Sequence, residues 1–311
     1  MPDSDDPPYR SPSRRHQRRF FYKYVSSEVA KTILANRTLR WSSPLLFNDP
    51  FDVTQELRLN FNESELNQAV VEELAALYGE GPDPDYAPSG LRQRLLKTMM
   101  DSLQEHPELR RRIIEEWHRS AGATTPGQIE AMAELKEKWR NLVPRLRILC
   151  LSELNDVTPM WNHYADAYRG VVLEFEAVDR LDSAFLVARP VTYQDAPPAI
   201  ANKEVWARCM SERGPSTYIE LFTEYEYVKT TPWAHEREWR IVSFARDDEP
   251  GCFSDISFMT RELAGVYLGA QCSQDDENDI LALLRHGLEH VSVYKASIVP
   301  TEARFTFQRI R

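Results

Sequence analysis

Two glutamates and an arginine occupy alternate positions in the stretch from Trp233 to Val242: Glu236, Glu238 and Arg240. Alternate side chains of a strand lie on one face, so the three charges are predicted to lie together. Neighbouring carboxylates repel each other, and this arrangement is useful mainly where a cation, a sugar hydroxyl or an arginine needs them. The pattern therefore predicts either a catalytic acid pair or a structural ion pair between Arg240 and Glu238. This stretch alone favours the ion pair.

Aromatic residues begin a predicted short helix over residues 160–168, which follows a polar loop. Trp161 and Tyr164 are three positions apart and are expected to share one face of this helix. Such a platform can stack on a nicotinamide ring or a base, although Trp and Tyr also fill protein cores. His163 lies off that face, and a lone histidine is weak evidence for a ligand or a base. Both interpretations of the aromatic pair stay open.

An early strand supplies a third group of candidates. The segment from Phe20 to Val25 is rich in aromatic and β-branched residues, and alternation places Tyr22 and Tyr24 on one face and Lys23 on the other. A lysine in such a strand can meet a phosphate, whereas snorkelling to the surface is the ordinary explanation. Ser42, in the next predicted strand, is a further candidate for this site.

Composition limits the classes of function. The 311-residue chain has a formal net charge of −10, which argues against a general nucleic-acid binder but leaves room for a phosphate-bearing ligand in a local basic pocket. No apolar run is long enough to cross a bilayer, and the first residues lack the apolar core of a secretory signal, so no membrane partner is expected. The four cysteines lack the spacing of a zinc site or a disulfide framework, which predicts a cytoplasmic protein without a bound metal.

The predicted elements describe one α+β domain over residues 20–311, preceded by a disordered arm over residues 1–19. A strand–helix–strand unit comes first, and helix formers at helical spacing then predict a helical insertion at about residues 63–142. We expect a strongly bent, mostly antiparallel sheet core, with the insertion packed outside it. Further strands are predicted at residues 147–152, 170–175, 187–193, 238–244, 265–269 and 291–294, and further helices at residues 201–227 and 275–286.

Taken in order, these motifs resemble a bacterial family known only as domain of unknown function 2971. Members usually carry an acidic residue directly after Asn-Asp-Pro-Phe, and that residue here is Asp52. The family name implies no activity. The resemblance spans about residues 20–270 and is carried by Phe21–Tyr24, Leu39–Pro44, Phe47–Phe51, Cys150–Ser152, Met160–Tyr164 with Gly170, Trp233 with Glu236–Arg240, and Tyr267–Gly269.

The same layout is more distantly similar to that of the ADP-ribosyltransferases, which have a bent α+β core and a late Glu-x-Glu strand. That resemblance implies that Glu238 stabilises the oxocarbenium ion formed when NAD loses nicotinamide, and that Glu236 orients the acceptor. Tyr22 or Tyr24 would lie near the ribose, and Tyr164 would stack on nicotinamide. The chain departs from that superfamily in having no His or Arg on its first strand. The other residues expected to contact NAD are Lys23, Ser42, Trp161 and Arg240.

We therefore expect an NAD-consuming enzyme that transfers ADP-ribose to a macromolecular or small acceptor, such as a toxin or a phage-defence effector. Its partners would be NAD or another nucleotide and a protein or nucleic-acid acceptor. A non-enzymatic nucleotide-sensing or protein-interaction module is the alternative. A metal-dependent nuclease, with Glu236, Glu238 and Asp49 as ligands, has weaker support. For a nucleotide site, the aromatic candidates and Glu238 should converge on one cleft.

Overall fold

The structure is a computed structural model that describes residues 9–54, 56–80, 91–120, 126–196, 199, 203–210, 222, 225–302 and 304–311. The chain divides into two compact units. Unit 1 comprises Met1–Thr54, Leu142–Pro197 and Tyr227–Arg311, and unit 2 comprises Gln55–Asn141 and Pro198–Glu226. All residues singled out by the sequence as candidates for chemistry belong to unit 1. The assignment of residues 20–311 to a single domain stays a prediction.

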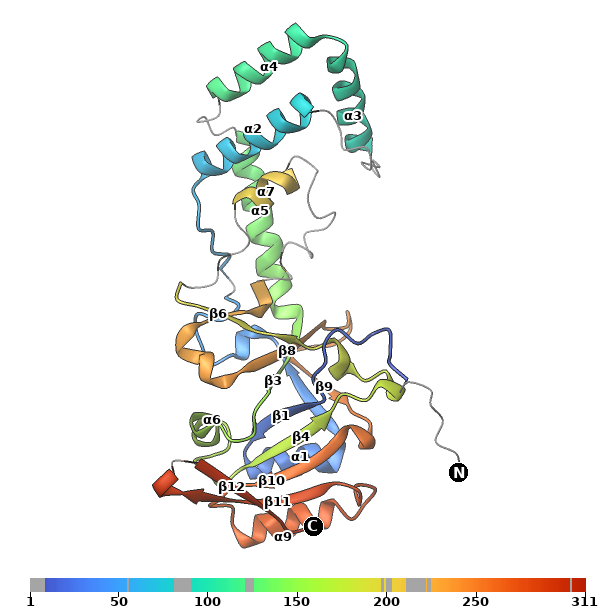
Figure 1. Ribbon diagram of the computed structural model, residues 1–311, viewed down its shortest axis with the longest axis vertical. Coiled ribbons are helices and arrows are strands. Elements are labelled where there is room, and N and C mark those ends of the chain that lie inside the picture. Colours follow the sequence, from blue (N-terminus) through green and yellow to red (C-terminus); the bar gives the residue numbers. More distant parts are fainter. Residues whose placement is uncertain are drawn as a thin grey trace. The chain divides into compact units, whose positions relative to one another are not determined.

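Unit 1 is built on a ten-stranded sheet with the order β12-β11-β10-β4-β1-β3-β2-β9, in which β8 pairs with β3 and β5 pairs with β8. Neighbouring strands run antiparallel, with the exception of β10 and β11. Mixed helices and a mostly antiparallel sheet confirm the predicted α+β class (Figure 1). The strands are β1 (Phe20–Val25), β2 (Thr38–Ser42), β3 (Leu146–Ser152), β4 (Val171–Glu176), β5 (Arg189–Pro190), β8 (Glu238–Phe244), β9 (Phe253–Ser257), β10 (Leu263–Leu268), β11 (Ser292–Val299) and β12 (Arg304–Arg309). A separate parallel pair joins β6 (Thr192–Gln194) to β7 (Val228–Thr230).

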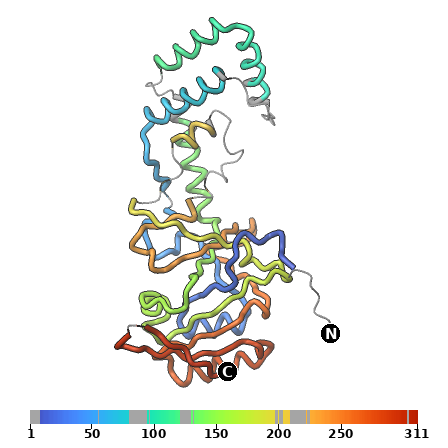
Figure 2. The backbone as a smooth tube through the Cα atoms, viewed as in Figure 1, coloured from blue at the N-terminus to red at the C-terminus, as the bar shows by residue number. Residues whose placement is uncertain are grey.

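Side chains from the central strands pack in two apolar clusters. Phe21 of β1 and Phe175 of β4 pack with α1 (Ser27–Asn36) and α9 (Gln274–Leu283) in the larger cluster. Tyr24 and its neighbours pack with α6 (Thr158–His163) in the smaller one. Segments from the beginning, middle and end of the chain therefore lie side by side in the sheet of unit 1, as the colours of Figure 2 show. This mixing brings candidate residues that are far apart in sequence into one region.

Local signals fix the connection between β1 and β2. Ser26 caps α1, because its side chain accepts a hydrogen bond from the backbone N–H of Val29. The helix ends at Asn36, and the next residue, Arg37, adopts the left-handed conformation with φ of 56°. The guanidinium of Arg37 donates to the carbonyl of His286 at 2.8 Å, which holds this residue in place.

Strand β3 is the branch point of the sheet. One of its edges pairs with β8 along its whole length, from Leu146 to Ser152. Strand β3 pairs with each of its other two neighbours at a single position. Ser152 of β3 pairs with Tyr22 of β1, and Ile148 of β3 pairs with Ser42 of β2. Side chains of β1 and β2 therefore face a shared region beside β3.

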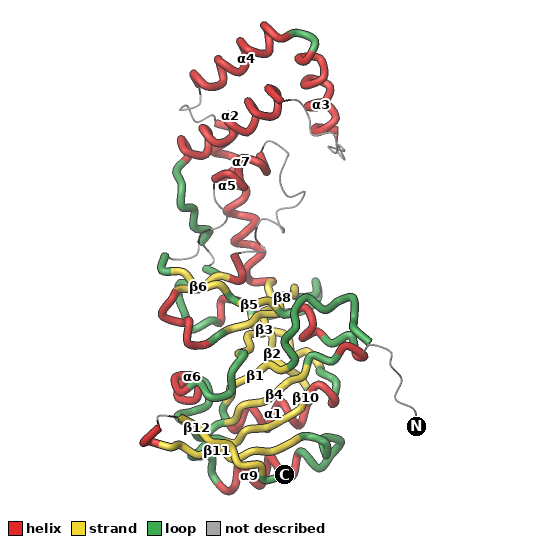
Figure 3. The backbone as a smooth tube through the Cα atoms, viewed as in Figure 1, coloured by secondary structure: helices red, strands yellow, loops and turns green. Residues whose placement is uncertain are grey.

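Every regular element in the described part of unit 2 is helical, and Figure 3 colours these helices red. Tyr78, Met100 and Trp117 pack in one cluster, and Trp139 contacts the rings of Phe222 and Tyr225. The helical character predicted for residues 63–142 is present in the described parts of that segment, residues 63–80, 91–120 and 126–142. The helices are α2 (Glu63–Glu80), α3 (Leu91–Gln104), α4 (Pro107–Ser120), α5 (Pro126–Leu142) and α7 (Lys203–Met210).

Three segments differ from the sequence prediction. The strand expected at residues 187–193 is instead the end of a 3-10 helix (Ala184–Val187) and the short strands β5 and β6. Of the helix expected at residues 201–227, α7 forms one part, residues 211–221 lie outside the described residues, and Tyr225–Tyr227 is a 3-10 helix. Strands β7, β9 and β12 were not predicted, because their sequences are short or polar.

The N-terminal arm also differs where it is described. Residues 1–8 of the predicted disordered arm lie outside the described residues. The segment Ser11–Arg18 is instead held by specific contacts, including the hydrogen bond from the Arg14 guanidinium to Asp179 at 2.8 Å. The charged side chains that suggested a solvated tail are used to fix the segment onto unit 1.

Candidate functional site

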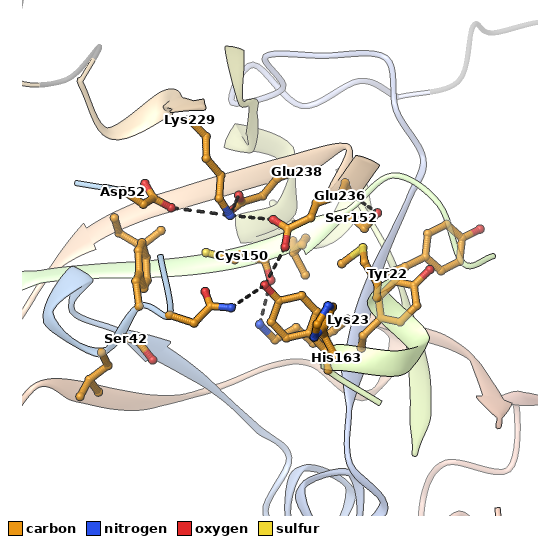
Figure 4. A pocket seen from close by; sticks show the side chains of 18 of the residues that line it. Tyr22, Lys23, Ser42, Asp52, Cys150, Ser152, His163, Lys229, Glu236 and Glu238 are labelled. Carbon is orange, nitrogen blue, oxygen red and sulfur yellow. Dashed lines mark hydrogen bonds and ion pairs between the residues drawn. The ribbon is translucent and has the colours of Figure 1, made fainter. Parts of the chain in front are cut away.

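A cavity of about 420 Å³ lies within unit 1, in the size range of small-molecule sites. Its wall is formed by β1, β2, β3, α6, the loop after β2, and the segment leading into β8. Figure 4 shows the side chains that surround it. The lining residues are Tyr22, Lys23, Tyr24, Arg40, Ser42, Leu46, Phe47, Asn48, Asp52, Ile148, Cys150, Leu151, Ser152, Met160, His163, Tyr164, Lys229, Glu236 and Glu238.

A buried cluster of three carboxylates and two cations, with a formal charge of −1, lies at the wall of the cavity; all of its members but Arg240 line the cavity. The Lys229 ammonium donates to Glu236 at 2.6 Å and to Glu238 at 3.1 Å, and lies 3.7 Å from Asp52. Arg240 donates to Glu238 at 2.8 Å and to Asp52 at 2.9 Å. All five residues are at most 5% exposed. Figure 4 shows the Lys229 nitrogen between Asp52 and Glu236.

Glu238 is the best-paired carboxylate of the cluster. Besides Lys229, two nitrogens of the Arg240 guanidinium donate to it, at 2.8 and 3.1 Å, and the Cys150 thiol also hydrogen-bonds to it. Burial alone would raise the pKa of Glu238, but the Arg240 and Lys229 charges outweigh it and hold the pKa at about 2. A carboxylate offers about four acceptor positions, so those of Glu238 are filled.

Asp52 is held differently from Glu238. Burial raises the pKa of Asp52 and the negative charge of Glu238 raises it further, whereas the Arg240 guanidinium opposes both effects. Both oxygens of Asp52 accept from Arg240, at 2.9 and 2.5 Å. Asp52 therefore serves mainly to neutralise a fully buried guanidinium.

Glu236 is the carboxylate with unused acceptor capacity. Lys229 donates to one oxygen, and the Tyr164 hydroxyl donates to the other at 2.6 Å. The amide nitrogen of Asn48 in turn donates to the Tyr164 hydroxyl at 3.2 Å. Burial raises the pKa of Tyr164, and the Glu236 charge raises it further, so the phenol stays protonated and donating. Two donors occupy about half of the acceptor positions of Glu236, at the cavity wall.

The wall also carries a cation outside this cluster, Lys23. The Lys23 ammonium donates to the carbonyl oxygen of Cys150 at 2.8 Å, and within the described residues it forms no ion pair. Tyr22 and Tyr24 also line the cavity, but their hydroxyls bond elsewhere, to Glu174 at 3.0 Å and to the Leu154 carbonyl at 2.9 Å. The Tyr24 ring is only 4% exposed and packs edge-on against Trp161, so Tyr22 is the less buried of the two.

Seven of the nine predicted site residues line this one cavity. Trp161 does not: it is 0% exposed in the apolar cluster beneath Tyr24, and its indole nitrogen donates to the Asn155 carbonyl. The stacking role expected of Trp161 is therefore wrong, because its ring is enclosed by the core. Arg240, also 0% exposed, lies behind Glu238 and not on the lining. The seven are Tyr22, Lys23, Tyr24, Ser42, Tyr164, Glu236 and Glu238, whose catalytic or binding roles stay predictions.

The sequence indicated one further member of the cluster and missed another. Asp52 was noted through the family resemblance, without a role. Lys229 was missed, although a lysine between Val228 and Thr230 in a short β-branched run is a weak signal of a buried cation. The alternation predicted for Glu238 and Arg240 is present in β8, whereas Glu236 ends a 3-10 helix and reaches the cluster through Lys229. The ion pair of Arg240 with Glu238, one of the two alternatives, is present.

No group of three or more His, Cys, Asp or Glu residues suited to a metal ion occurs in the described part of the chain. The carboxylates named for a nuclease do not gather as a ligand set, because Lys229 and Arg240 neutralise Glu236 and Glu238. None of the helices that the structure describes is long and apolar enough to cross a membrane.

Comparison with known proteins finds a match to one family model over part of the chain. Residues 160–241, from within α6 to within β8, match the family model described as protein of unknown function (DUF2971). This segment carries Tyr164, Lys229, Glu236 and Glu238. No curated protein and no solved structure matches the chain. The resemblance to ADP-ribosyltransferases therefore stays a prediction.

Proposed function

We propose that the cavity binds NAD and that the protein is an ADP-ribosyltransferase-like enzyme, which breaks the bond between nicotinamide and ribose and passes ADP-ribose to an acceptor. The observation that carries this proposal is the incompletely neutralised carboxylate cluster at the wall of an aromatic cavity. Three carboxylates share two cations there, and Glu236 keeps free acceptor positions. A fixed negative charge in a site shielded from water suits a reaction that develops positive charge on a sugar.

The rest of the cavity suits the other parts of this ligand. The unpaired Lys23 ammonium can receive the pyrophosphate. The Tyr164 ring lies beside Glu236, where the nicotinamide end would bind if the carboxylate faces the ribose. Ser42 and the rings of Tyr22 and Tyr24 complete the wall.

The roles of the two glutamates follow from their contacts. As the bond between C1′ and the nicotinamide nitrogen breaks, the electron pair leaves with nicotinamide and the ribose becomes an oxocarbenium ion. Glu236, with its free acceptor positions, stabilises that charge and takes the proton that the acceptor loses when its lone pair bonds to C1′. Glu238, whose oxygens are filled by Arg240 and Lys229, orients the cluster. The direct role thus moves to Glu236 from Glu238, to which the resemblance to ADP-ribosyltransferases assigns it.

The activity would use cytoplasmic NAD, and NAD consumption of this kind would suit a toxin or a phage-defence effector. The acceptor is a protein, a nucleic acid or a small molecule. Both acids are tied to cations, which supports electrostatic catalysis over metal-dependent hydrolysis.

Nicotinamide release from NAD by purified protein, with and without cell lysate, tests the proposal. We expect release that rises when lysate supplies the acceptor. Calorimetric binding of NAD without nicotinamide release under either condition would instead support the nucleotide-sensing alternative. Absence of both binding and release would reject NAD as the ligand.

A further inference from the structure

The two glutamates of the site are joined by a turn with an unusual backbone. Arg237, between them, adopts the left-handed conformation with φ of 48° and ψ of 49°, which costs energy for a residue with a side chain. The end of β3 holds this turn at two points. The Ser152 hydroxyl donates to the Glu236 carbonyl at 2.7 Å, and the Glu153 N–H donates to the Arg237 carbonyl at 3.1 Å. The positions of both carboxylates thus depend on Ser152 and Glu153.

The Glu153 side chain fixes the same turn from the face opposite the cavity. It accepts from the Arg237 guanidinium at 2.6 Å and from the Trp239 indole at 3.2 Å. Trp239 packs edge-on against the rings of His16 and Phe21, and neither Arg237 nor Trp239 lines the cavity. Glu153 is not part of the cavity lining. Nothing in the proposed reaction uses this half-buried carboxylate directly.

A third donor to Glu153 comes from the N-terminal segment. Arg18 donates to the Glu153 carboxylate at 2.7 Å, and its guanidinium lies 5.5 Å from the centre of the Trp239 ring. We call Ser11–Arg18 the strap. His16 of the strap contacts Trp239 edge-on, with ring centres 5.1 Å apart, and Arg14 fastens the strap to Asp179.

We infer that Glu153 is a positioning residue for the site, and that the strap, through Arg18, is a structural part of the same site. Glu153 joins the strap to the turn that presents Glu236 and Glu238, and it touches no ligand. Displacement of the strap leaves Arg237 and Trp239 less firmly held and lets the left-handed turn relax. The effect on catalysis rests on the proposed function, whereas the effect on the turn does not.

Hydrogen exchange of the full-length protein tests the structural part. Arg18→Gln and Glu153→Gln should each speed amide exchange in residues 236–239 about tenfold, because the turn loses a charged anchor. Arg19→Gln is the matched control: the neighbouring arginine has its own ion pair with Glu176 at 2.8 Å but no contact with Glu153. Wild-type exchange in both test variants would overturn the inference. If Glu153→Gln fails to fold, Arg18→Gln decides, since Arg14 still fastens the strap.

Steady-state kinetics test the catalytic part. Both variants should lower kcat for nicotinamide release about tenfold while KM changes less than about twofold, because the ligand contacts remain and only the orientation of the acids changes. A loss that falls on KM would contradict a positioning role. If the wild-type protein releases no nicotinamide, the proposed function fails, and the exchange result still decides whether Glu153 and the strap hold the turn.

Discussion

Replacing Glu238 by glutamine should destabilise the protein far more than the same change at Glu236. Glu238 neutralises Arg240, which is 0% exposed, so Glu238→Gln leaves that guanidinium with Asp52 as its carboxylate partner. Removing one partner of a buried ion pair costs about 3–5 kcal/mol. Loss of one charge from a cluster of formal charge −1 offsets part of this cost, so we expect about 3 kcal/mol. Glu236→Gln removes the same charge but leaves Lys229 paired with Glu238, and should cost about 1 kcal/mol.

Thermal melting followed by circular dichroism can separate these values. A loss of 1 kcal/mol lowers Tm by about 2–4 °C in domains of about 150–250 residues, so the expected decreases are about 6–12 °C for Glu238→Gln and about 2–4 °C for Glu236→Gln. Chemical denaturation of the same two proteins gives an independent ranking. Equal stabilities, or the reverse order, would refute the assignment of Glu238 as the anchor and Glu236 as the ligand-facing acid.

Three further predictions follow from the site. The pKa of Glu238 is lowered from about 4.5 to about 2, so the ionised carboxylate contributes its full stabilisation above about pH 4.5 and loses it as the pH falls toward 2. The pKa of Asp52 is raised, so the contribution of Asp52 to stability changes with pH in the opposite direction. The Tm difference between wild type and Glu238→Gln should therefore become smaller as the pH falls from about 5 to about 2. A Tm difference that stays constant over this pH range would contradict the lowered pKa of Glu238. Lys23→Met should weaken NAD binding about 10–100-fold by calorimetry with little change in Tm, whereas an unchanged Kd would remove Lys23 from the site. Burial raises the pKa of the Cys150 thiol, so mass spectrometry should show alkylation of Cys150 at least about 100-fold slower than in the unfolded protein, and equal rates would show that the thiol is accessible.

Residue patterns predicted the parts of the fold that local chemistry determines. The aromatic and β-branched runs of β1 and β2 and the serine cap of α1 are local signals, and all are present. The same holds for β8, where alternation places Glu238 and Arg240 on one face, whereas Glu236 lies before the strand in a 3-10 helix and joins them through the left-handed turn at Arg237. The segment that became β5 and β6 was misassigned, because Val187–Tyr193 carries β-forming residues but bends at the 3-10 helix before Arg189.

The candidate site was only partly predictable, because its geometry depends on contacts across the sequence. Lys229 comes from β7 and Asp52 from the loop after β2, and neither residue carries a local sign that it joins Glu238. Trp161 had the spacing of a ligand platform, yet the packing of α6 against Tyr24 encloses it. The strap was predicted to be disordered because nothing near its arginines in the sequence indicates a partner. Their partners are Asp179, which pairs with Arg14, and Glu153, which pairs with Arg18, and both lie far away in the sequence.

The central claim is that Glu236 supplies the charge that stabilises a developing cation on NAD. The most direct measurement is the rate of nicotinamide release at saturating NAD by wild type and Glu236→Gln, with melting curves recorded on the same samples. The account predicts a rate lower by about 10²–10³ in a variant that stays folded. A folded Glu236→Gln protein that releases nicotinamide at the wild-type rate would contradict it.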